Sequence, residues 1–212
     1  MARSFDLVVF DLGGVLVRTV ASWGEAHRRA GLPSDPPTDP AFLTLLVGLA
    51  DRQDGSITSG EFFREAAAAC GGTYRVDDIR RISDAWLMGE YPEIARVFDR
   101  LDAAGLDTAI LSNTNDAHWP RLVSTNGDAE FPTLLRARHR FASLLLGLMK
   151  PDPAISRVVE ERTGHLASRI LLFDDLEPNV RAARAVGWTA ERIDPGGDPA
   201  GQMLDALRGH GI

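Results

Sequence analysis

The sequence predicts an α/β fold, a Rossmann-like parallel sheet core with a helical cap inserted after the first strand. Short apolar runs alternate with helical patterns along most of the chain, which is typical of parallel βαβ units. Residues 18–90 break this alternation with helical stretches alone. A length of 212 residues suits one α/β domain with a modest insertion.

The strands are predicted from continuous apolar runs bounded by charged or turn residues. Leu7–Phe10 lies before Gly13 and Gly14, the pattern of a strand buried on both faces. Runs of the same kind occupy 108–111 and 170–173, and weaker ones 142–146 and 189–193. These segments are the predicted strands of the core.

The core helices are predicted from apolar periodicity that ends at a glycine. The segments are 92–104, 152–163, 177–186 and 199–208, closed by Gly105, Gly164, Gly187 and Gly209. Pro92, Pro153 and Pro178 fall where a first helical turn tolerates proline. We therefore expect helices on both faces of an open sheet.

Residues 18–90 are the predicted cap, and residues 1–17 with 91–212 the predicted core. The cap has helical patterns at 21–30, 40–50, 59–69 and 76–88 and no convincing strand. Thr58, followed three residues later by Glu61, is an N-cap signal. An insertion here would cover the carboxyl ends of the strands, where open α/β sheets bind ligands.

Composition limits the class of partner. The net charge of −7 argues against a nucleic-acid surface, which needs a basic patch. No apolar run approaches the roughly 20 residues of a membrane helix. The start of the chain shows no signal peptide, and Cys70 is a single cysteine that can form no disulfide within the chain. We expect a cytoplasmic protein that binds neither nucleic acid nor membrane.

Polar residues follow several predicted strands, at the edge where the site of such a fold lies. They are Asp11, Ser112 with Asn113, and the pair Asp174 and Asp175, with Lys150 in a further loop. A carboxylate can accept a phosphoryl group, Mg²⁺ prefers oxygen ligands, and a lysine neutralises the transferred group. This set of residue types predicts phosphoryl transfer without a nucleotide cofactor, because neither a P-loop nor a dinucleotide fingerprint is present.

Lys150 is the only lysine among 23 basic residues. A chain that uses arginine almost everywhere keeps a lysine where a compact ammonium is needed and the planar fork of arginine would not fit. This favours a functional role for Lys150.

Four ordered segments resemble the four motifs of the haloacid dehalogenase (HAD) superfamily. They are Phe10-Asp11-Leu12-Gly13-Gly14-Val15-Leu16, Leu111-Ser112-Asn113-Thr114-Asn115, Lys150-Pro151-Asp152-Pro153 and Phe173-Asp174-Asp175-Leu176-Glu177-Pro178-Asn179-Val180. The resemblance spans essentially the whole chain, including the cap. The first two segments are most similar to the branch of glucose-1-phosphate phosphatase-like and soluble epoxide hydrolase N-terminal phosphatase proteins.

The resemblance implies a role for each matched residue. Asp11 would be the nucleophile and a Mg²⁺ ligand, and the carbonyl of Gly13 a second ligand. Asp175 would bind Mg²⁺ directly, and Asp174 would contact a metal-bound water or Lys150. Ser112, Asn113 and Lys150 would hold the phosphoryl group of the substrate.

Gly13 departs from the pattern, because the family normally has an aspartate there as general acid/base. Such a group contributes roughly 10²–10⁴-fold in rate. Three interpretations stay open: a leaving group that needs little protonation, such as an anomeric or acyl oxygen; a replacement by Asp116 or His118; or a slow or non-catalytic relative.

The predicted function is a Mg²⁺-dependent phosphatase that acts on a small phosphorylated metabolite through an aspartyl phosphate, a sugar phosphate being one candidate. Dehalogenases of the family also lack the aspartate at the position of Gly13, but Asp174 and Asp175 favour the metal-dependent reaction. A catalytically weak binding protein is a further alternative. The cap should select the substrate, and its aromatic residues are expected mostly in the cap interior: Trp23, Phe62, Phe63, Trp86 and Tyr91.

Overall fold

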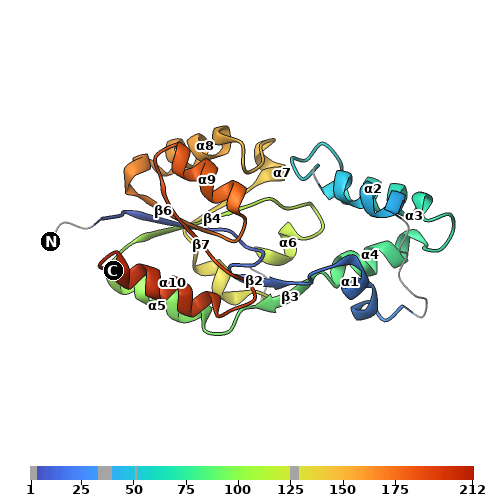
Figure 1. The fold of residues 1–212 in the computed structure, drawn as a ribbon, viewed down its shortest axis with the longest axis horizontal. Coiled ribbons are helices and arrows are strands. Elements are labelled where there is room, and N and C mark those ends of the chain that lie inside the picture. Colours follow the sequence, from blue (N-terminus) through green and yellow to red (C-terminus); the bar gives the residue numbers. More distant parts are fainter. Residues whose placement is uncertain (1–3, 33–39, 51, 125–128) are drawn as a thin grey trace.

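A five-stranded parallel sheet forms the centre of the computed structural model, which describes residues 4–32, 40–50, 52–124 and 129–212. The strand order is β5-β4-β1-β6-β7, and every neighbouring pair is parallel. The strands are β1 (Leu7–Phe10), β4 (Asp107–Ser112), β5 (His139–Ala142), β6 (Ile170–Asp174) and β7 (Thr189–Arg192). The α/β fold with a Rossmann-like sheet is confirmed (Figure 1).

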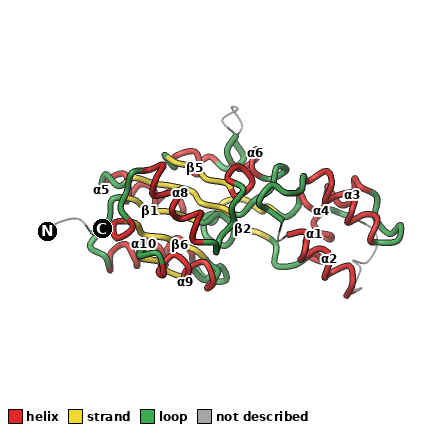
Figure 2. Tube along the Cα trace, turned by 90° about the horizontal axis from the view of Figure 1, so that it is seen from above, coloured by secondary structure: helices red, strands yellow, loops and turns green. Residues whose placement is uncertain are grey.

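Both faces of the sheet are covered by helices, as its apolar strands require (Figure 2). Alternate residues of β1 point to opposite sides, so Val8 and Phe10 pack with one group of helices and Leu7 and Val9 with the other. The first group is α5 (Ile94–Ala104) and α10 (Pro199–Gly209), and the second is α8 (Pro153–Thr163) and α9 (Glu177–Ala185). This packing holds the central strands rigidly.

Several predicted helix ends are confirmed. Gly105 and Gly164 close α5 and α8 in the left-handed conformation, with φ of 62° and 72°. Two expectations are wrong. Pro92 lies outside α5, whose N-cap Glu93 is left-handed with φ 62°, and Gly209 lies inside α10, which ends before Gly211.

The predicted strand at 142–146 is also wrong. The strand β5 ends at Ala142, and Ser143–Leu146 forms the helical turn α7. The apolar residues at 144–146 resemble a strand pattern in the sequence, but Gly147, with φ 65°, ends a helical turn there. Periodicity alone does not distinguish such short apolar runs.

Four helices form a separate cluster beyond the sheet, at the right of Figure 1. They are α1 (Trp23–Arg29), α2 (Pro40–Ala50), α3 (Ser59–Ala69) and α4 (Val76–Asp84). Their own apolar core includes Ala26, Phe42, Phe63, Ile79 and Ile82. Thr58 caps α3 in a capping box with Glu61, as the sequence predicts.

A two-stranded antiparallel ribbon links this cluster to the sheet. It pairs β2 (Val17–Thr19) with β3 (Leu87–Glu90), so the expectation of no strand within 18–90 is wrong, and the helix predicted to reach residue 88 ends at Asp84. Gly89 has φ 110°, which a helix does not allow. The division at residues 18 and 90 into core and cap stays a prediction.

The remaining elements are short: α6 (Trp119–Leu122), η1 (Pro132–Arg136) and η2 (Ala167–Arg169). Among the described residues, no helix is long and apolar enough to cross a membrane.

Phe98 offers a test of the core packing. Its ring is fully buried, stacks on Phe10 at 5.4 Å between ring centroids, and carries the Arg136 guanidinium at 5.6 Å. Phe98→Ala should lower the free energy of unfolding by about 3–5 kcal/mol, because it leaves a cavity between α5 and β1. Urea denaturation checks this, with Leu145→Ala as control, whose side chain is exposed. A loss below 1 kcal/mol for Phe98→Ala would contradict the packing described.

Candidate active site

The carboxyl ends of three neighbouring strands bring the predicted site residues together. Asp11 follows β1, Ser112 ends β4, and Asp174 ends β6 with Asp175 next in the chain. Because β1 lies between β4 and β6 and all three run parallel, their ends meet at one edge of the sheet. The order of the strands therefore brings residues from three distant parts of the sequence together in one site.

Lys150 lies between two of the carboxylates. Its Nζ is 2.8 Å from Asp11 Oδ1 and 2.7 Å from Asp174 Oδ2, and the residue is only 6% exposed. Two charge-assisted hydrogen bonds hold the ammonium in place. Burial alone would lower the pKa of Lys150, but Asp11 and Asp174 outweigh it and raise the pKa. Lys150 is therefore a fixed positive charge.

Asn113 uses its side-chain amide on the backbone of Lys150. Its Nδ2 donates to the Lys150 carbonyl at 2.8 Å, and its Oδ1 accepts from the Lys150 N–H at 2.9 Å. The sequence predicts that Asn113 holds the phosphoryl group. Its side chain positions Lys150, and the role in holding the phosphoryl group stays a prediction.

Asp174 is fully buried and has several partners. Besides Lys150, its carboxylate accepts from Asn179 Nδ2 at 2.9 Å and from the Leu176 N–H at 3.0 Å. Of the two partners expected for Asp174, Lys150 is the one in contact. Sequence reasoning missed the role of Asn179, although it lies on the first turn of α9, near enough to Asp174 to suggest a contact.

Asp11, Asp174 and Asp175 form a cluster of carboxylates. Each offers an oxygen within 4.8 Å of the others, a suitable arrangement for a metal ion. Gly14 lies directly against this cluster, with φ 76°, and a Cβ atom there would lie 2.5 Å from Asp175 Oδ2. Only glycine leaves room for the carboxylate, a constraint that sequence analysis did not identify. A Cβ at Gly13 would meet only the Thr19 methyl group, at 3.6 Å.

The charges in the cluster do not balance. Burial raises the pKa of Asp11 to about 7, and repulsion from Asp174 and Asp175 adds to this against the opposing effect of Lys150. Burial and the charge of Asp174 also raise the pKa of Asp175 to about 6. Three carboxylates around one ammonium leave an excess of negative charge, which a divalent cation with oxygen ligands would neutralise. The residues present therefore fit Mg²⁺.

Ser112 and its neighbours lie at the end of β4, on the other side of β1 from Asp174 and Asp175. Ser112 is buried and its hydroxyl donates a long hydrogen bond of 3.3 Å to the Asn113 carbonyl. The Thr114 N–H donates to Ser143 Oγ at 3.0 Å, and the Ser143 hydroxyl in turn donates to the Gln53 carbonyl. This chain of contacts fixes the loop after β4 against the segment that precedes α3.

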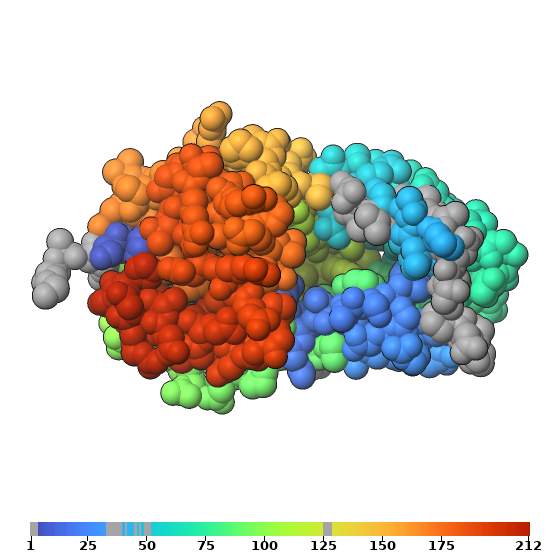
Figure 3. All heavy atoms as spheres, viewed as in Figure 1, coloured from blue at the N-terminus to red at the C-terminus, as the bar shows by residue number. Residues whose placement is uncertain are grey.

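The site opens into a cavity of about 980 Å³ between the sheet and the helical cluster. Asp11, Ser112, Lys150 and Asp175 line one end of it. Figure 3 shows the surface hollowed between the orange part of the core and the blue and cyan helices. The opposite wall includes Trp23, Phe62 and Trp86, which also pack against the apolar core of the helical cluster, so the expectation of an interior position is only partly confirmed for them. A position at the junction with the core exposes one face of each to the cavity.

The other two aromatic residues lie elsewhere. Phe63 is buried in the cap interior, as expected. Tyr91 donates from its hydroxyl to the Pro195 carbonyl at 3.1 Å and packs against the core.

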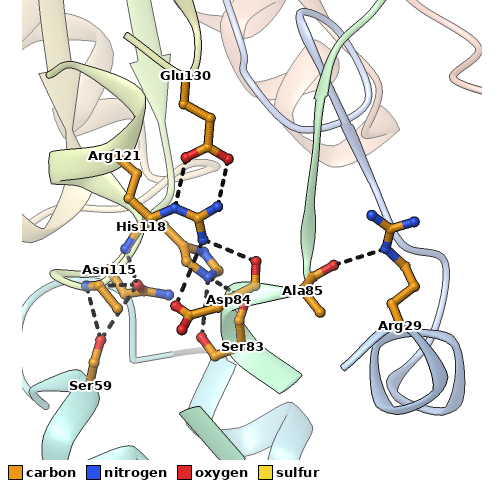
Figure 4. A network of polar contacts seen from close by, with 10 residues as sticks. Arg29, Ser59, Ser83, Asp84, Ala85, Asn115, His118, Arg121 and Glu130 are labelled. Atoms are coloured by element: carbon orange, nitrogen blue, oxygen red, sulfur yellow. Dashed lines mark hydrogen bonds and ion pairs between the residues drawn. The ribbon is translucent and has the colours of Figure 1, made fainter. Parts of the chain in front are cut away.

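Asp116 and His118 connect the core to the helical cluster, and Figure 4 shows His118 beside Ser83. Asp116 Oδ1 accepts from the Ser59 N–H at 2.7 Å and from the Ser59 hydroxyl at 2.5 Å. His118 Nε2 donates to the Ser83 carbonyl at 2.9 Å, and burial lowers its pKa. Arg121, one turn along, binds Glu130 and the Asp84 carbonyl. These contacts give both candidate acid/base groups a structural task, and a catalytic role for either stays a hypothesis.

Comparison with known proteins identifies the family. A family model described as haloacid dehalogenase-like hydrolase matches residues 5–187. The chain belongs to this family. As a HAD-like hydrolase it is an enzyme, and the resemblance noted in its four motifs is confirmed.

Related proteins with curated names include phosphatases. The chain is 26% identical to acyl-CoA dehydrogenase family member 10 of Mus musculus over 98% of its own length, but it spans only 19% of that protein. It is 27% identical to a phosphatase of Mycobacterium tuberculosis, over 92% of this chain and 89% of the relative. It is 23% identical to the phosphorylated carbohydrates phosphatase of Thermotoga maritima, over 89% and 83%.

Solved structures confirm the fold. A HAD family enzyme of Bacteroides thetaiotaomicron, in complex with magnesium and inorganic phosphate, aligns with a TM-score of 0.70 and 20% identity, over 92% of this chain and 96% of that one. A dehalogenase aligns with a TM-score of 0.69 and 20% identity, over 96% and 91%. At this identity the likeness shows a shared fold, and the fold alone does not separate the two reactions.

Gly14→Ala tests the role of Gly14 at the carboxylate cluster. The new methyl group would displace the Asp175 carboxylate, so the affinity for Mg²⁺ measured by calorimetry should fall at least roughly tenfold. Gly147→Ala is the matched control, since Gly147 has a similar φ of 65° but no atom within 4 Å of its Cβ position. Equal Mg²⁺ affinity in the two variants would contradict the constraint.

The raised carboxyl pKa values predict that protons compete with Mg²⁺. Asp11 and Asp175, with pKa values of about 7 and about 6, are ionised at pH 8 and increasingly protonated below pH 7. The Mg²⁺ affinity should therefore fall by roughly tenfold or more per pH unit below 6. Calorimetry in buffers of different ionisation enthalpy would detect release of protons on binding near pH 6.5. An affinity constant from pH 5.5 to 8 would argue against a site at these carboxylates.

Proposed function

We propose that this protein is a Mg²⁺-dependent phosphatase that hydrolyses a small phosphorylated metabolite through an aspartyl phosphate. The proposal rests mainly on the position of Lys150, whose Nζ lies within 2.8 Å of both Asp11 and Asp174 in a cluster of three carboxylates. This arrangement provides a nucleophile, a fixed cation and ligands for a second cation at the mouth of one cavity. Phosphatases among the related proteins support it.

Asp11 is the proposed nucleophile. Its carboxylate attacks phosphorus, the bond to the leaving oxygen breaks, and water then cleaves the aspartyl phosphate and regenerates the carboxylate. Lys150 holds Asp11 in position and neutralises charge on the phosphoryl group. Ser112, which lines the cavity, would bind a phosphoryl oxygen.

Asp11, Asp175 and the Gly13 carbonyl would hold Mg²⁺, and Asp174 would keep Lys150 in place. When bound, Mg²⁺ supplies positive charge that reduces the repulsion between the Asp11 carboxylate and the phosphoryl group. The core binds only the phosphoryl group, so the helical cluster at residues 18–90, which forms the far wall of the cavity, would select the rest of the substrate.

A dehalogenase is the second candidate, favoured by one observation. Gly13 provides no acid, and a carbon–halogen bond needs none to break. Displacement at carbon also needs no metal ion, and it gives no reason for the excess of negative charge at Asp174 and Asp175. Release of halide from 2-haloacids without Mg²⁺, together with no phosphate release, would favour this candidate instead.

Replacement of the nucleophile tests the mechanism. Asp11→Asn should lower phosphate release from p-nitrophenyl phosphate by more than about 10⁴-fold, because an amide cannot form the covalent intermediate. In the wild type, rapid mixing should show a burst of nitrophenol approaching one per active site. Thermal melting of both proteins controls for folding, and undiminished turnover by Asp11→Asn would overturn the mechanism.

Lys150→Arg tests the need for a compact cation. A guanidinium does not fit between two carboxylate oxygens that each lie within 2.8 Å of Nζ, so kcat/KM should fall at least roughly hundredfold. The reverse change at a surface position, Arg100→Lys, serves as the control, since Arg100 is exposed on α5. Activity near that of the wild type in Lys150→Arg would show that charge alone suffices.

A further inference from the structure

The wall of the cavity that faces the carboxylates is mainly apolar. Trp23, Phe62 and Trp86 lie there together with Leu46 and Ile57. Trp23 is held by edge-to-face contacts with Phe42, at 5.5 Å, and Tyr74, at 6.2 Å, between ring centroids. This wall is therefore a fixed aromatic surface, which favours a flat, apolar ligand.

Three hydroxyl groups on the same wall, those of Thr58, Ser59 and Ser83, make contacts within the protein, and the polar residues Thr19 and Gln53 also line it. The Thr58 hydroxyl donates to Glu61 at 2.7 Å, and the Ser59 hydroxyl donates to Asp116. Ser83 Oγ lies 3.2 Å from His118 Nε2. Among the described residues at 18–90 that line the cavity, Arg52 is the charged one, and its side chain is 45% exposed beside Glu65. A sugar, which needs several hydrogen-bonding partners, would find few on this wall.

A second feature, separate from the aromatic wall, limits which leaving groups the site can release. Gly13 has no side chain to protonate a departing oxygen, and the space where its Cβ would point is bounded by the Thr19 methyl group. Asp116 and His118 are held in the contacts with Ser59 and Ser83. Without a general acid, a leaving oxygen must carry its own negative charge, which a phenol does far more readily than an alcohol.

We propose that the substrates of this site are aryl phosphate monoesters, in which an aromatic ring carries the phosphorylated oxygen. The proposal rests on the proposed phosphatase function and names its substrate class. The aromatic wall at Trp23, Phe62 and Trp86 receives the ring, and the absence of an acid at Gly13 restricts the reaction to leaving groups that depart as anions.

The bond changes balance without a further reactant. An Asp11 oxygen forms the new bond to phosphorus, and the electrons of the breaking P–O bond stay on the aryl oxygen, which leaves as a phenolate and takes a proton from solvent. Water then attacks the phosphorus of the aspartyl phosphate. This step yields inorganic phosphate, restores the Asp11 carboxylate and returns a proton to solvent.

Three substrates test the two parts of the proposal, the anionic leaving group and the aromatic body, separately. Phenyl phosphate and benzyl phosphate carry the same ring but differ in leaving oxygen, whereas benzyl phosphate and glucose 6-phosphate share an alcohol oxygen but differ in the body attached. The ratio of kcat/KM for phenyl over benzyl phosphate should be at least about 10². Benzyl phosphate should exceed glucose 6-phosphate by at least about tenfold, because the apolar wall receives the ring.

Two variants show which residues set these ratios. A Cβ at residue 13 makes only ordinary contact with the Thr19 methyl group, and Gly13→Asp should raise kcat/KM for benzyl phosphate about tenfold or more, while Gly13→Asn, of the same size but without an acid, should not. Trp86→Ala should reduce the preference for benzyl phosphate over glucose 6-phosphate, mainly through KM. Thermal melting of each variant reports whether it is folded.

The outcomes are distinct. Hydrolysis of glucose 6-phosphate as efficient as that of phenyl phosphate would overturn the substrate class while leaving the phosphatase intact. Equal kcat/KM for phenyl and benzyl phosphate would overturn the argument from Gly13. Release of phosphate from none of the three, with Mg²⁺ present, would overturn the proposed function itself, and with it this inference.

Discussion

The site depends on one electrostatic constraint, the convergence of three carboxylates, two of them buried, beside a single buried ammonium. Asp11, Asp174 and Asp175 converge because three parallel strands end at one edge of the sheet, and Lys150 satisfies two of them. The charge that remains raises the pKa of Asp11 to about 7 and favours a divalent cation. Several neighbours exist to hold this cluster together: Asn113 on Lys150, Asn179 on Asp174, and Gly14 beside Asp175.

The charged cluster opens into a cavity whose far wall is aromatic. The sheet supplies rigidity and the reacting groups, whereas the helical cluster supplies the surface that a substrate body would contact. Polar contacts join the two parts, from Ser59 to Asp116 and from Ser83 to His118. The Ser59 hydroxyl also donates to Asp116, so this contact between the helices and the core occupies a polar group that lines the cavity.

Phosphatases and dehalogenases share this fold, so the choice between reactions lies in a few side chains. In this chain the paired carboxylates at the end of β6 favour transfer of a phosphoryl group, and Gly13 removes one source of protons. Each of these residues affects a different step. The carboxylates and Lys150 act on the approach of the nucleophile, whereas Gly13 would limit which leaving groups can depart in the proposed reaction.

The sequence by itself determined the sheet, most of its helices and which polar residues lie at the carboxyl edge of the sheet, because apolar runs, glycine caps and polar residues after strands are local signals. Two short segments were predicted wrongly: residues 143–146 form a helical turn, and residues 87–90 pair as a strand because Val17–Thr19 lies beside them. Only the tertiary structure assigned Asn113 to Lys150 and placed Trp23, Phe62 and Trp86 on the cavity. Contacts between segments far apart in the chain depend on how helices pack, and no local pattern records that.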